Sequence, residues 1–176
     1  MKAAMVLTCT ALIASGAARL PSSLANPGAK SVIVEIKNAV GQSIGTATLT
    51  DAAPGVRIKL DIRTLPPGEH SVHIHQFAKC EGPDFKSAGP HFTGAAGGHD
   101  HSGAPAGDIP NFILVVGGDG TAHASVVAPK VTLGGDDHSV FSNGGTALVV
   151  HAKADDMKSD PAGNAGDRVA CGAITK

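Results

Sequence analysis

Four histidines from three separate segments are the residues of this sequence best suited to chemistry. His73 and His75 stand two positions apart in a strand-like run, so both imidazoles should project from the same face. His91 follows in a turn bounded by glycine and proline, and His151 closes an apolar run. Each alone would more often be a core histidine, but together they favour a metal site. Four imidazole nitrogens suit Cu(II), which accepts tetragonal nitrogen ligation and binds most tightly in the divalent series.

The elements that must position these histidines are short extended runs separated by Gly, Pro, Asp and Asn. Residues 56–63 alternate apolar and charged side chains, as expected for a strand with one buried and one solvated face. No run beyond the N-terminal segment has helical periodicity. The pattern predicts an all-β sandwich or barrel. The expected strands are 31–38, 43–51, 56–65, 69–77, 111–116, 121–128, 145–153 and 168–174.

Two longer segments interrupt this rhythm. Residues 78–110 are rich in Gly and Pro and hold three of the nine histidines, and residues 153–167 are rich in Asp, Gly and Ala. Long segments without regular structure are uncommon inside a compact domain, and function or a bound metal is their usual reason. We therefore expect two functional loops.

The N-terminal segment has the order of a secretory signal peptide. One early lysine, Lys2, precedes an apolar run too short to span a bilayer, and small residues lead to Ala25. We predict a signal peptide over residues 1–25, with cleavage after Ala18 as an alternative, and one domain over residues 26–176. No later apolar run is long enough to span a membrane, so the predicted mature chain should not be membrane-bound.

Cysteine usage and charge narrow the function further. Cys9 would leave with the signal peptide, and Cys80 and Cys171 would then most simply pair in an oxidising compartment. Only two basic residues and no acidic ones lie in residues 1–25, so the mature chain would carry a net charge of −3. Without a basic stripe, Trp or Tyr, the composition argues against a nucleic-acid partner.

Five motifs recur in order along the chain: GEHSVHIH at 68–75, AGPHF at 88–92, GDIP at 107–110, LVVHAKADD at 148–156 and GNAGDRVACG at 163–172. Together they resemble the copper/zinc superoxide dismutases of the bacterial secreted kind. The resemblance implies an eight-stranded Greek-key sandwich or flattened barrel with two long functional loops. It also implies a secreted, periplasmic enzyme that converts superoxide to oxygen and hydrogen peroxide by Cu(II)/Cu(I) cycling.

The same resemblance implies a role for each matching residue. Copper would be bound by His73, His75, His91 and His151, with His91 also bridging to zinc and supplying a proton. Arg168 would sit over the copper and attract superoxide. The supporting residues would be Asp155 as a carboxylate that orients ligand histidines, His70 as a structural hydrogen-bonding residue, and the disulfide pair Cys80 and Cys171.

The zinc half of the pattern is less complete. The family places a histidine three positions before the zinc aspartate, but here Asp108 is preceded at that spacing by Pro105. His99 and His101 lie in the shortened loop, and with His91 and Asp108 they could complete a tetrahedral zinc site. The alternatives are a copper-only dismutase without structural zinc and a non-catalytic periplasmic copper-binding module on the same fold. Whether the protein is a monomer or a homodimer is left open by the sequence.

Overall fold

The computed structural model describes residues 30–95, 105–109, 112–156, 158–159 and 163–176. In these residues it contains eight antiparallel strands and two short 3₁₀ helices, which confirms the all-β prediction. No helix in the described residues is long and apolar enough to cross a membrane. The elements are β1 (Ser31–Asn38), β2 (Ser43–Asp51), β3 (Val56–Ile62), β4 (Gly68–His75), η1 (Lys86–Ala88), β5 (Ile113–Val116), β6 (Ala122–Ala128), η2 (Ser142–Gly144), β7 (Thr146–His151) and β8 (Arg168–Ile174).

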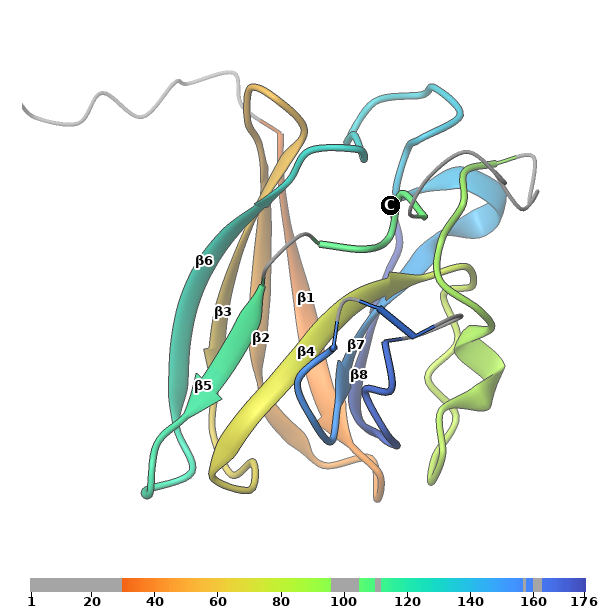
Figure 1. The fold of residues 1–176 in the computed structure, drawn as a ribbon. Helices are drawn as coiled ribbons and strands as arrows, with labels where there is room; N and C mark the ends of the chain where they lie inside the picture. Colours follow the sequence, from red (N-terminus) through yellow and green to blue (C-terminus); the bar gives the residue numbers. More distant parts are fainter. Residues whose placement is uncertain (1–29, 96–104, 110–111, 157, 160–162) are drawn as a thin grey trace, which may run out of the picture.

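The strands follow one another around a nearly closed barrel in the order β5-β4-β7-β8-β1-β2-β3-β6. The two end strands, β5 and β6, are joined by a tight turn in which the Gly117 N–H donates to Thr121 O (2.9 Å). The connections from β3 to β4 and from β6 to β7 cross between the two halves of the barrel (Figure 1). These crossings make the predicted Greek key.

Alternation along the strands builds the barrel interior. In β3, Val56, Ile58, Leu60 and Ile62 are buried while the charged residues between them are mostly exposed. The strands β1 and β2 contribute inward-facing Val34, Ile36 and Leu49 in the same way, and the core has neither Trp nor Tyr. Burial of these aliphatic side chains is the dominant favourable term for the fold.

Strands β4 and β7 are buried on both faces. Their inward residues, such as Ile74 and Leu148, join the main core, whereas Val149 on the outward face packs in a second, smaller cluster with Phe85 and Cys171. Residues 78–95 and the segment after β7 cover this outward face, on one side of the barrel (Figure 1). A double covering explains why the sequence of β7 is continuously apolar.

Several predicted strand ends were too long. β3 ends at Ile62 and not at 65, because Thr64 has a left-handed φ of 59° that an extended strand excludes. β7 begins at Thr146 because Gly145 has a φ of 118°. β4 ends at His75, after which the Gln76 N–H donates to Pro90 O (2.9 Å) outside the sheet ladder. Position 111 lies outside the described residues.

The predicted cysteine pair forms a disulfide. Cys80 is joined to Cys171 across a sequence separation of 91, with a Cα–Cα distance of 5.6 Å. Cys171 pairs with Val149 of β7 in the strand register, so the bridge lies on the same outward face as the histidines of β4. It fastens the loop after β4 to the last strand.

Candidate metal centre

Strand register places three of the four candidate histidines on one face. His73 lies opposite Val149 and His75 opposite Ala147, and His151 follows these two residues on the same side of β7. Because alternate strand residues share a face, all three imidazoles project outward beneath the covering loops. Each is at most 3% exposed.

His91 is brought next to these three histidines by backbone hydrogen bonds between its own segment and the end of β4. It forms an antiparallel bridge with His75, and the Phe92 N–H donates to Ile74 O (2.8 Å). Gly107 contacts both β4 and the segment that holds His91. The Ile74 N–H donates to Gly107 O (2.9 Å), and the Gly107 N–H donates to Phe92 O (2.7 Å). A Cβ at Gly107 would collide with Ile74 O, so only glycine fits this position.

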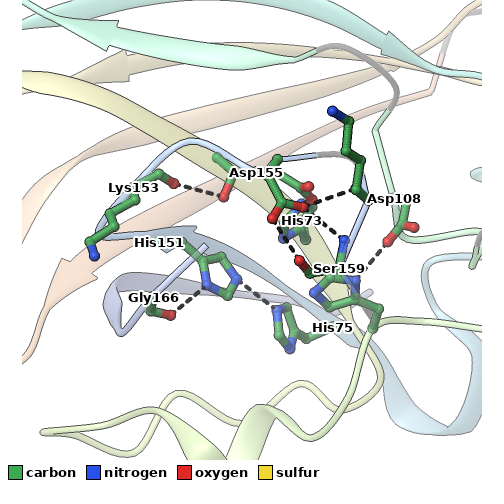
Figure 2. A network of polar contacts seen from close by, with 12 residues as sticks. His73, His75, Asp108, His151, Lys153, Asp155, Ser159 and Gly166 are labelled. Carbon is green, nitrogen blue, oxygen red and sulfur yellow. Dashed lines mark hydrogen bonds and ion pairs between the residues drawn. The ribbon is translucent and has the colours of Figure 1, made fainter. Parts of the chain in front are cut away.

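One nitrogen of every ring already has an acceptor from the protein. For His75 and His151 the Nδ1–H groups point to carbonyl oxygens, at Gly89 O (2.8 Å) and Gly166 O (3.3 Å). For His73 the Nε2–H donates to Asp155 (3.0 Å), and for His91 the Nδ1–H donates to Asp108 (2.6 Å), as Figure 2 shows for this network. These partners fix the tautomers and leave the second nitrogen of each ring as a bare acceptor.

The four bare nitrogens face one another. His73 Nδ1 and His91 Nε2 are buried without a hydrogen-bond partner, and His75 Nε2 lies 3.3 Å from His151 Nε2, where neither nitrogen has a proton to donate. One ring nitrogen from each of the four histidines lies within 4.8 Å of the others. Imidazole nitrogens bind metals at about 2 Å, so donors across one ion stand roughly 4 Å apart. The residues therefore fit a single cation with nitrogen ligation.

Burial keeps these imidazoles neutral. Desolvation, together with the neighbouring histidines, lowers the pKa of His73 to about 3, of His75 to about 2 and of His151 to about 4. A neutral imidazole is the form that binds a metal. Burial therefore disfavours the protonated imidazoles and leaves the neutral form, which can bind a metal.

These shifts predict that the metal-free protein loses stability in mild acid. The three folded-state pKa values lie below 6.5, so the unfolded chain binds protons first as the pH falls. Each histidine then costs up to about 1.4 kcal/mol per pH unit below 6.5. We expect urea unfolding of the chelator-treated protein to show a steep fall in stability from pH 7 to pH 5. A variant with exposed His123 replaced by alanine should retain this slope, and a flat profile in the parent protein would contradict the burial argument.

Asp155 is held against His73 by the segment after β7. The Asp156 N–H donates to Gly163 O (2.8 Å), which folds this segment back on itself. Gly163 has a φ of 58°, and a Cβ there would overlap the Asp155 carboxylate. The glycine therefore leaves the space in which Asp155 can reach the ring.

Asp155→Asn is expected to weaken copper binding about 10- to 100-fold, the range usual for a partner that orients a ligand histidine. The asparagine amide keeps the size of the side chain but removes the charge that favours Nε2–H on His73. Competition with a copper chelator measures the affinity, with Asp156→Asn as the control for a neighbouring exposed carboxylate. Equal affinities for the two variants would refute an orienting role for Asp155.

Arg168 lies next to this cluster. In the β7–β8 register Arg168 lies opposite His151. Its guanidinium donates to Phe85 O (2.8 Å) and to Gly89 O (2.7 Å). Partial burial lowers its pKa, while Asp84 acts in the opposite direction. A guanidinium nevertheless stays protonated in proteins, so a fixed positive charge stands beside the bare nitrogens.

Sequence similarity to known proteins points to the same kind of site. The family model described as copper/zinc superoxide dismutase (SODC) matches residues 43–174, which include all four histidines. The chain belongs to this family. It is 46% identical over 145 residues to Cu-Zn superoxide dismutase 1 of Aquifex aeolicus, covering 80% of this chain and 85% of that protein. It is 37% identical over 148 residues to the Escherichia coli K12 Cu-Zn superoxide dismutase, covering 77% and 80%.

Solved structures of the family share the fold. A double mutant of a superoxide-dismutase-like protein from Bacillus subtilis matches with a TM-score of 0.73 and 33% identity, over 82% of this chain and 97% of that chain. The Cu/Zn superoxide dismutase from Brucella abortus matches with a TM-score of 0.65 and 28% identity, over 82% and 99%. The fold inferred from the motifs is therefore confirmed.

The predicted zinc site lies only in part within the described residues. His91 and Asp108 come together, with the carboxylate on the ring nitrogen that faces away from the other three histidines. The predicted zinc ligands His99 and His101 lie outside the described residues, as does the predicted signal peptide. Pro105, where the family pattern has a histidine, is half-buried.

Three further positions support the centre. Gly107 and Gly163 each begin a family motif, but their roles cannot be read from the sequence, because a glycine that makes room for a neighbour resembles a turn glycine until the neighbour is known. His70 is buried, with Nδ1 2.7 Å from His151 O and Nε2 2.9 Å from Pro66 O, so both nitrogens are engaged away from the cluster. By contrast, the side chain of His123, on β6, is 72% exposed.

Proposed function

We propose that this protein dismutes superoxide, converting two superoxide anions and two protons to oxygen and hydrogen peroxide. The observation that carries the proposal is the convergence of four unprotonated ring nitrogens beside a fixed guanidinium. The proposed copper ligands are His73 Nδ1 and the Nε2 atoms of His75, His91 and His151. Copper supplies one-electron redox chemistry when bound, oxidising one superoxide and reducing the next.

The chain's own residues then have three tasks. The Arg168 guanidinium attracts and orients the anionic substrate, because it carries a permanent charge with donors in a planar fork. His91 Nε2, which carries no proton in this structure, would take up a proton from solvent whenever it is not bound to the metal and pass it to the reduced substrate. Asp108 or zinc on Nδ1 would keep the ring oriented. Asp155 holds the His73 ring so that Nδ1 faces the cluster.

Zinc is the second proposed metal, bound by His91, His99, His101 and Asp108. Support comes from the family and from the His91–Asp108 pair, in which a carboxylate oxygen lies 2.6 Å from the imidazole nitrogen that zinc would take. Two nitrogens or more with one carboxylate are a common zinc ligand set. Anomalous scattering at the copper and zinc edges tests it; one copper and no zinc in an active protein would favour the copper-only alternative.

We also propose that the protein is secreted to the periplasm after loss of residues 1–25. The Cys80–Cys171 disulfide supports this location, since such bridges persist in oxidising compartments. Mass spectrometry of the protein from an osmotic-shock fraction tests it. A mature N-terminus at Asn26 is expected, and full-length protein in the cytoplasm would refute the proposal.

Arg168→Ala should lower kcat/KM for superoxide about tenfold and weaken its dependence on ionic strength, within the range of electrostatic steering. Arg168→Lys should retain part of the rate, and Arg57→Ala, which removes an exposed arginine of β3, should leave it unchanged. Pulse radiolysis of copper-loaded protein measures the rate. Copper-loaded parent protein without dismutase activity would instead favour the copper-binding module.

A further inference from the structure

We infer that Phe85 is the positioning residue for Arg168, an inference that rests on the proposed function. Arg168 is aimed by the carbonyl oxygens of Phe85 and Gly89, both of which belong to the loop between β4 and His91. Whatever fixes these two carbonyls fixes the guanidinium. The disulfide at Cys80 fastens one end of this loop, but it lies five positions from Phe85.

The backbone of Phe85 has an unusual conformation. Its φ of 52° and ψ of 23° are left-handed, which a bulky residue adopts only when its surroundings compensate the cost. Local bonds support the turn: the Phe85 N–H donates to Glu81 O (3.1 Å), and the Lys86 N–H donates to Asp84 Oδ1 (3.1 Å). The left-handed turn directs the Phe85 carbonyl to Arg168.

The ring of Phe85 supplies the compensation. It is 1% exposed and is the largest side chain of the smaller apolar cluster on the outward faces of β7 and β8. The other buried members of this cluster are Ala88, Ala147, Val149 and Cys171, and the partly buried Ala39 and Cys80 pack against it. Because Arg168 begins β8, the ring anchors the loop to the same strand that carries the guanidinium.

Copper ligation does not depend on this anchor in the same way. His73, His75 and His151 are positioned by the β4–β7 ladder, and His91 by its bridge to β4. Gly89 O, which His75 shares with Arg168, is held beside β4 on both sides, because the Phe77 N–H donates to Ala88 O (3.0 Å) and the Gln76 N–H donates to Pro90 O (2.9 Å). Loss of the ring should therefore release the guanidinium from Phe85 O while the four ring nitrogens stay together. This separation distinguishes a positioning residue from one that merely supports the fold.

A double-mutant cycle on the copper-loaded protein tests the inference. Phe85→Ala should retain one bound copper and lower kcat/KM about as much as Arg168→Ala does, and it should have no further effect in the Arg168→Ala background. Phe85→Leu, which keeps an apolar anchor, should restore most of the rate. Phe141→Leu is the control, since this half-buried ring packs on the main core away from Arg168.

A second readout is independent of activity. In the diamagnetic copper(I) protein, Arg168 should give separate NMR signals for its Nη–H groups, because two carbonyls restrict rotation of the guanidinium. These signals should merge in Phe85→Ala and separate again in Phe85→Leu. Unchanged signals in Phe85→Ala, or effects that multiply in the cycle, would overturn the inference. An inactive parent protein would refute the proposed function, and the NMR result would still decide the role of Phe85.

Discussion

His151→Ala is expected to reduce copper affinity by more than 100-fold and dismutase activity with it. The imidazole is one of the four proposed copper ligands, and its Nδ1–H bond to Gly166 O fixes Nε2 toward His75. Outer partners of a metal ligand typically contribute 10- to 100-fold in affinity, so a ligand itself should contribute more. The alanine also leaves His75 Nε2 facing a void in place of a shared cation.

Thermal unfolding with and without copper measures this effect directly. A metal that binds only the folded state raises the melting temperature of the parent protein in proportion to the logarithm of its excess over Kd. The rise should disappear in His151→Ala and persist in His123→Ala, which removes an exposed imidazole from β6. A copper-dependent rise of equal size in both variants would contradict the ligand assignment.

Replacing both Cys80 and Cys171 by alanine is expected to cost roughly 4–5 kcal/mol of stability. The bridge closes a loop with a sequence separation of 91, and the chain-entropy model assigns this magnitude to loops of that length. Domains of this size are stable by about 5–15 kcal/mol, so the loss is a large part of the total. Because the histidines are held by the β4–β7 ladder, copper should still bind below the melting temperature.

Urea unfolding of the oxidised parent, the reduced parent and the double-alanine variant measures the cost. The double-alanine variant should be somewhat less stable than the reduced parent, because it lacks the two sulfur atoms, one of them from buried Cys171, in addition to the covalent link. Arg57→Ala, an exposed substitution on β3, serves as the control for surface changes. A difference below about 1 kcal/mol between oxidised and reduced parent would show that the loop is held by packing around Phe85 and not by the bridge.

The sequence alone determined the class of fold and the ligand candidates. Strict alternation in β3 required a half-buried strand, and the spacing of His73 and His75 required a shared face once β4 formed. Strand ends were less predictable, since a single left-handed residue such as Thr64 stops a strand without changing its apolar pattern. The family motifs supplied the strand order, which alternation by itself does not encode.

Tertiary structure alone decided which nitrogen of each histidine is free. That choice depends on acceptors distant in sequence: Gly89 O for His75, Gly166 O for His151 and Asp155 for His73. Two of the three are backbone carbonyls, and a carbonyl is present at every residue, so no side-chain pattern can reveal them. The aim of Arg168 was fixed in the same way by Phe85 and Gly89. The residue types therefore indicated the kind of chemistry. The folded chain, largely through main-chain carbonyl groups, set the orientation of each histidine ring and of the Arg168 guanidinium.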